Sequence, residues 1–95
     1  MDTALELTKI PIRIIKEQEL VIGPLAWAEA QKVDGLSINQ AHTEASLTGD
    51  AKDVINRLVA RYERLFGKTS LEVCKEAIKD IATRIPAADL PESLR

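Results

Sequence analysis

Residues 50–85 read DAKDVINRLVARYERLFGKTSLEVCKEAIKDIATRI, and their apolar side chains recur at the spacing of two amphipathic helices. Asp50 is placed to cap the first helix, and Gly67 ends it. Thr69 and Glu72 fit a capping box that opens the second helix, and Pro86 ends that helix. The two helices are therefore expected to pack as an antiparallel αα-hairpin. The apolar positions are Val54, Ile55, Leu58, Val59, Tyr62, Leu65 and Phe66 in the first helix, and Cys74, Ala77, Ile78, Ile81, Ala82 and Ile85 in the second.

Two short alternating segments precede these helices. Residues 36–38 read LSI and residues 45–47 read ASL, and the polar residues 39–44 between them suit a turn. Alternation places every second side chain on the same face of a strand. The pattern predicts a β-hairpin whose inward-facing residues are Leu36, Ile38, Ala45 and Leu47.

Residues 10–22 are predicted to be extended, because Ile10, Ile12 and Ile14 alternate and Pro11 suits the start or the edge of a strand. The polar residues 16–19 leave two alternatives, a single long strand with a bulged middle or a hairpin that turns near Glu17. The middle lacks Gly, Asn and Asp for a tight turn, which favours the single strand. Gly23 and Pro24 end it, and an alanine-rich helix is expected over residues 25–33.

Together these elements predict an α+β fold in the order β-α-β-β-α-α. We expect a small three-stranded sheet, antiparallel or mixed, with helices packed on one face and an αα-hairpin at the end. The 95 residues fit one compact domain, 1–95, in which residues 1–9 and 87–95 are ends that can fray. Such a sheet exposes edges and one face, so a homodimer is an economical way to cover them.

Composition argues against several classes of function. A net charge of −2 and only three aromatic side chains disfavour nucleic-acid binding, which needs a basic excess and stacking platforms. No apolar run approaches the roughly 20 residues of a membrane span, and the acidic N-terminal residues do not resemble a signal peptide. We therefore expect a cytoplasmic protein with no membrane partner.

Candidate catalytic groups are few. His42 is the only histidine and lies in the expected turn, where a solvated side chain is the simplest interpretation. Cys74 is the only cysteine and falls on an apolar stripe, which is typical of a buried structural thiol. The sequence carries neither a metal-ligand set nor a cofactor fingerprint, so no metal and no cofactor are expected. An enzyme that uses Cys74 or His42 is the less favoured hypothesis.

The most specific polar pattern is cationic. Arg57, Arg61, Arg64 and Lys68 are spaced 4, 3 and 4 apart, which lines them along one face of the first predicted helix. Such a stripe suits docking of an acidic protein partner, although it is also compatible with a plain solvated face. Trp27, the only tryptophan, is equally compatible with an interface and with the core.

These features favour a non-enzymatic regulatory or protein-interaction module that forms a homodimer and docks an acidic partner on its basic helix face. The candidate interaction residues are Arg57, Arg61, Arg64, Lys68 and Trp27. The alternative is a domain that senses a small ligand or anion, such as a nucleotide or phosphate, with the arginines as anchors.

Overall fold

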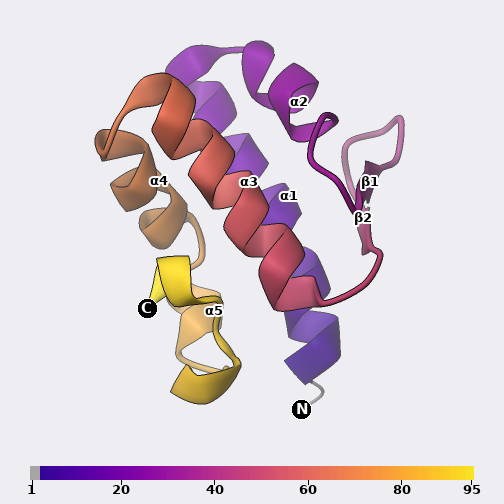
Figure 1. Ribbon diagram of the computed structural model, residues 1–95, viewed down its shortest axis with the longest axis vertical. Coiled ribbons are helices and arrows are strands. Elements are labelled where there is room, and N and C mark those ends of the chain that lie inside the picture. Colours follow the sequence, from indigo (N-terminus) through magenta and orange to yellow (C-terminus); the bar gives the residue numbers. More distant parts are fainter. Residues whose placement is uncertain (1–2) are drawn as a thin grey trace.

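The chain is mostly helical, with one small β-hairpin in its middle (Figure 1). The computed structural model describes the backbone of residues 3–95 and the side chains of residues 6–95. Its elements are α1 (Thr3–Ile22), α2 (Leu25–Ala30), β1 (Leu36–Ile38), β2 (Ala45–Leu47), α3 (Ala51–Phe66), α4 (Thr69–Ala77) and α5 (Lys79–Ala82), followed by the 3-10 turns η1 (Ala87–Asp89) and η2 (Glu92–Leu94).

The prediction of a strand over residues 10–22 is wrong, because this segment belongs to the 20-residue helix α1. The alternation of three isoleucines covers only five residues, too few to separate a strand from a helix. Over a longer window most of the buried positions recur three and four residues apart, as on one side of a helix. These are Leu7, Ile10, Pro11, Ile14, Ile15 and Gln18, and Glu6 and Ile12 are buried as well.

Pro11 lies inside α1 and is fully buried. A proline in a helix interior removes one backbone hydrogen bond and typically costs about 3 kcal/mol. Burial of the neighbouring isoleucines offsets that loss, since each fully buried side chain of this size contributes about 1.5–3 kcal/mol. Helix packing therefore overrides the local preference that favoured a strand edge.

The expected three-stranded sheet and the order β-α-β-β-α-α are corrected accordingly. Within residues 3–95 the sheet has two strands, and the order begins with two helices. The β-hairpin itself is confirmed: β1 and β2 are antiparallel, with Leu36 opposite Leu47 and Ile38 opposite Ala45. Leu36 is buried, and the other three apolar side chains pack against the core.

The C-terminal helices are confirmed, with one difference in detail. Asp50 caps α3 by accepting a hydrogen bond from the backbone N–H of Lys52 at 2.9 Å, and Gly67 follows the end of α3. The predicted second helix is divided into α4 and α5 at Ile78, whose backbone leaves the helical region. The capping box is wrong, because Lys68 precedes the first turn of α4 and provides no side-chain cap.

The core lies where α1, α3 and α4 pack together, and α2 closes one end (Figure 1). The C-terminal segment lies on α3, where Asn56 Oδ1 accepts hydrogen bonds from the backbone N–H and the hydroxyl of Ser93 at 3.1 and 2.6 Å. Leu90 and Leu94 of this segment are buried. Fraying of this end in solution stays a prediction. None of the helices in the described part of the chain is both long enough and apolar enough to cross a membrane.

Candidate cationic docking site

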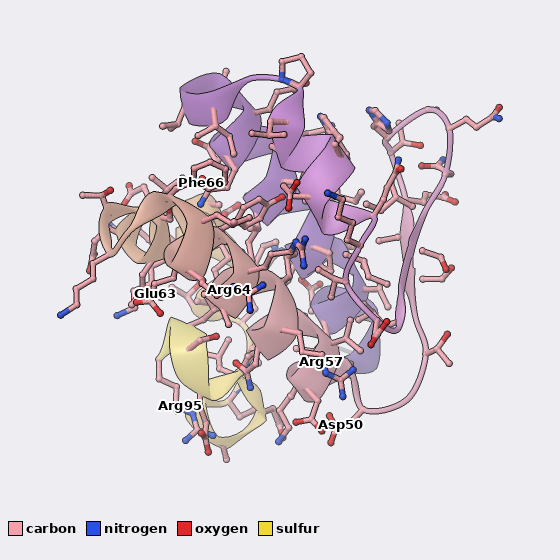
Figure 2. All side chains as sticks on the ribbon, turned by 45° about the horizontal axis from the view of Figure 1, so that its top comes forward. Asp50, Arg57, Glu63, Arg64, Phe66 and Arg95 are labelled. Carbon is pink, nitrogen blue, oxygen red and sulfur yellow. The ribbon has the colours of Figure 1, made fainter. Side chains whose placement is uncertain are left out.

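The cationic stripe of α3 lines one wall of a shallow pocket. Arg57, Arg61 and Arg64 come from three successive turns of α3, and Figure 2 shows Arg57 and Arg64 projecting from the same helix. The opposite wall is the segment 32–34, which joins α2 to β1. The pocket has a volume of about 470 Å³ and is open to solvent.

Two apolar residues also line this pocket. They are Val33, which is buried, and Ala60, which is exposed on α3. Lys32 and Asp34 contribute from the loop side. The pocket lining therefore combines four cationic groups and one carboxylate with two apolar side chains.

Arg61 is held in place by a buried carboxylate. Its Nη2 and Nε lie 2.8 and 3.0 Å from Oε1 of Glu29 on α2. The other oxygen of Glu29 accepts a hydrogen bond from Lys32 Nζ at 3.1 Å. Hydrogen bonds from Lys32 and Arg61 hold the pKa of Glu29 below its ordinary value. Glu29 thus stays ionised and fixes two of the four cations.

The other two arginines are freer. Arg57 Nη1 donates a hydrogen bond to the backbone carbonyl of Asp34 at 3.2 Å. The side chains of Arg57 and Asp34 are both exposed. Arg64 is exposed, and within the described part of the chain it forms no ion pair or hydrogen bond through its side chain. Arg64 is therefore the pocket cation with the most capacity for an external anion.

The structure does not bring all five sequence-predicted residues together. Lys68 is exposed but lies beyond Gly67, at the corner between α3 and α4 and outside the pocket lining. Trp27 is buried on α2, where its indole ring packs face to face with the imidazole ring of His42. His42 lies in the turn as predicted, and this stacking leaves it half-buried and not fully solvated.

Glu29 and Lys32 were not identified from the sequence. Their spacing of three residues on a predicted helix indicates a local ion pair, and this is the only signal they carry. Their contact with Arg61 joins residues 32 positions apart, which no local pattern encodes.

The single cysteine of the chain lies away from this pocket. Cys74 is buried as expected, and burial raises the pKa of its thiol to about 11, although a hydrogen bond from Gln18 counteracts part of that rise. Within residues 6–95 no cluster of three or more His, Cys, Asp or Glu side chains is arranged to hold a metal ion.

Comparison with protein-family models, with curated proteins and with solved structures finds no match for this chain. The geometry and charge of the pocket therefore bear most directly on function.

Proposed function

We propose that the protein is a non-enzymatic interaction module that holds an acidic segment of a partner protein against the cationic face of α3. The observation that carries this proposal is the convergence of Arg57, Arg61, Arg64 and Lys32 on one open pocket. The chain as a whole carries a net charge of −2, so this concentration of positive charge opposes the overall charge. A local field of this kind attracts and orients an acidic partner.

The cost of keeping these cations together supports a role beyond a solvated surface. Like charges three and four residues apart on a helix are mutually destabilising. Glu29 offsets the repulsion for Arg61 and Lys32 by pairing with both. No carboxylate of the described chain lies within 4.0 Å of the Arg57 or Arg64 guanidinium. A carboxylate brought by a partner would neutralise these two arginines.

The dimensions of the site favour a peptide segment over a free anion. From Arg57 to Arg64 the cationic side chains span seven residues, which is about 10 Å along a helix. A single phosphate would reach only part of that length, whereas successive carboxylates on a peptide can match it. The pocket is also open, so it does not enclose a small ligand as typical small-molecule sites do.

The test is binding of a fluorescein-labelled, glutamate-rich 12-residue peptide, followed by fluorescence anisotropy. The double variant Arg57→Glu/Arg64→Glu should weaken binding by about tenfold or more, and added salt should weaken binding to the wild type. Lys79→Glu on α5 is a control, because it reverses one exposed charge far from the pocket. Circular dichroism verifies that each variant folds.

Arg61 is left unchanged in this test, because its reversal would place a second carboxylate against Glu29 and endanger the fold. Equal loss of binding in the control and in the double variant would contradict the proposal, as would no binding at all. Tight binding of inorganic phosphate or a nucleotide instead of the peptide would favour the anion-sensor alternative.

The homodimer predicted from the sequence needs a different basis. It was inferred from the edges of a three-stranded sheet, and residues 3–95 contain only two short strands. Self-association therefore stays a prediction.

A further inference from the structure

A second pocket lies between α1 and β2, and it shares no lining residue with the cationic pocket. Thr8, Lys9, Ile12 and Arg13 of α1 form one wall, and residues 43–46 form the other. The pocket has a volume of about 470 Å³, and Figure 1 shows the hairpin beside α1. Successive side chains of a strand point to opposite faces. A pocket lined by four consecutive residues of the hairpin therefore lies along the edge of β2 and not against one face.

This edge of β2 carries unpaired backbone groups. Within residues 3–95 the sheet has two strands, so β2 pairs with β1 alone. The backbone N–H of Thr48 donates to the carbonyl of Gly35 at 2.8 Å, which makes this a hydrogen-bonded pair. Bonded and non-bonded pairs alternate along an antiparallel ladder, so the N–H and C=O groups of Leu47 and Ala45 point away from β1. In the described part of the chain these four groups form no hydrogen bond.

The wall on α1 offers one apolar and one cationic contact to a segment laid along this edge. Ile12 supplies apolar surface, and the side chain of Lys9, three residues earlier, is 55% exposed. Lys9 has a single long ion pair, with Glu6 at 3.6 Å, whereas Arg13 is already hydrogen-bonded to Asp80. Residues three apart on a helix lie about 5–6 Å apart, close to the roughly 6.6 Å between alternate residues of a strand. Lys9 and Ile12 can therefore meet two alternate side chains of one strand.

We propose that this pocket is a second binding site, which takes an extended segment of a partner protein as an added strand on β2. In such strand addition the backbone hydrogen bonds supply affinity, and pockets for alternate side chains supply specificity. The segment pairs with the free N–H and C=O groups of Ala45 and Leu47. It carries an apolar residue that contacts Ile12 and, two residues away, an acidic residue that contacts Lys9.

The edge of β2 favours an extended segment over a helix. A helix satisfies its own backbone groups and would leave those of β2 unpaired. An added strand pairs them, and it also covers an edge that is otherwise open to uncontrolled association. The exposed carboxylate of Glu44 lies in the pocket lining and forms no ion pair in the described part of the chain. Glu44 disfavours a run of acidic residues, which separates this ligand from that of the cationic pocket.

The probe is a fluorescein-labelled peptide, Thr-Glu-Thr-Val-Thr-Glu-Thr, followed by fluorescence anisotropy. Its valine has a glutamate two residues away on either side, so it suits both strand directions. N-methylation of alternate residues should abolish binding in one set and leave it unchanged in the other, because only every second N–H of an added strand faces β2. In the wild type, bound peptide should slow hydrogen exchange of the Ala45 and Leu47 amides at least tenfold.

Two pairs of variants locate the peptide on the protein. Ala45→Pro removes one N–H of the outer edge and should weaken binding at least tenfold. Ile38→Pro is its matched control and should bind as the wild type does, because Ile38 lies opposite Ala45 and its N–H faces the other edge of the hairpin. Lys9→Gln should weaken binding about threefold, whereas Lys16→Gln, on α1 but outside the pocket, should have no effect. Circular dichroism verifies that each variant folds.

Each other outcome has a defined meaning. Failure of the wild type to bind the peptide would overturn the inference, as would equal effects of the two N-methylated sets. Unchanged exchange at Ala45 and Leu47 in the complex would exclude strand addition, whatever the proline variants do. Binding that is lost in Arg57→Glu/Arg64→Glu and unchanged in Lys9→Gln would place the peptide in the cationic pocket. That result would overturn the second site and leave the proposed function standing.

Discussion

The indole ring of Trp27 and the imidazole ring of His42 stack with their centroids 3.9 Å apart and their planes at 11°. This contact joins the only tryptophan of the chain to its only histidine. The tip of the hairpin therefore packs against α2. His42 adopts a left-handed backbone conformation with φ of 58°. Asn39 stabilises the turn, since its side-chain oxygen accepts hydrogen bonds from the backbone N–H groups of Thr43 and Glu44. The hairpin tip is thus a fixed part of the fold.

Replacing His42 by Ala should uncover one face of Trp27 and shift its fluorescence emission to longer wavelength. The loss of stacking should lower the free energy of unfolding by about 1 kcal/mol. His42→Phe is the matched control, because it keeps an aromatic ring in the same position. Trp27 is the only tryptophan, so the emission of the whole protein reports this contact. Identical emission spectra for the wild type and His42→Ala would show that the rings do not stack in solution.

The sequence predicted the parts of the fold that are encoded locally. The hairpin strands, the start of α3 at Asp50 and the long apolar stripe of α3 each follow from patterns within a few residues. α1 was missed because Pro11 and a five-residue alternation mimic a strand edge. The helix becomes evident only when burial is followed from Leu7 to Gln18.

The candidate site was predicted only in part, because only some of its residues belong to one local pattern. The cations of α3 were visible as a stripe, since helical spacing is a property of one segment. Their partners on α2 were not, because the approach of Glu29 to Arg61 depends on how two helices pack. Trp27 could not be assigned to core or interface, because its stacking on His42 is likewise a long-range contact.

Glu29 should make folding stability depend on pH in the acidic range. Its pKa is lower in the folded protein than its ordinary value of 4.5, because Lys32 and Arg61 stabilise the carboxylate. The contribution is therefore present above the unfolded pKa and is lost as the pH falls through the lower folded pKa. In urea denaturation, Glu29→Gln should have a lower free energy of unfolding than the wild type at pH 7. This difference in free energy should decrease as the pH is lowered toward 3.

Asp80 provides the comparison for Glu29. Its pKa is also lowered, by a hydrogen bond from Arg13, but its side chain is exposed. Asp80→Asn should therefore lower the free energy of unfolding at pH 7 by less than Glu29→Gln does, since solvent screens an exposed ion pair. Its difference from the wild type should also decrease toward pH 3. A stability difference between the wild type and Glu29→Gln that stays constant from pH 7 to pH 3 would exclude an ionised Glu29 as the stabilising group.

Cys74 should resist thiol reagents as long as the protein is folded. Its side chain is buried, and Gln18 Nε2 donates to its sulfur at 3.4 Å and to the carbonyl of Ser70 at 3.0 Å. With a pKa of about 11, only about one thiol in a thousand is ionised at pH 8. A chromogenic disulfide reagent at pH 8 should react with the native protein at the rate of unfolding and with urea-unfolded protein at once. Rapid reaction of the native protein would place Cys74 at an accessible surface.

Gly35 and Gly23 offer a matched pair that tests the wall of the cationic pocket. Both have a left-handed backbone, with φ of 87° and 73°. A Cβ at Gly35 would lie 2.8 Å from the Val54 side chain and 2.9 Å from the Thr48 carbonyl, whereas a Cβ at Gly23 would meet nothing within 4 Å. Gly23→Ala should therefore cost about 1 kcal/mol of backbone strain, and Gly35→Ala about 2–4 kcal/mol because overpacking is added.

Binding should separate the same two variants. Gly35 directly follows the segment 32–34 that forms the loop wall of the pocket, so a shift that relieves the clash also moves Lys32 and the carbonyl that holds Arg57. Gly35→Ala should weaken binding of the glutamate-rich peptide under conditions in which the variant is folded, while Gly23→Ala should bind as the wild type does. Equal binding by both variants would mean that the position of this loop does not matter to the acidic ligand, and the docking surface would then be the exposed face of α3 alone.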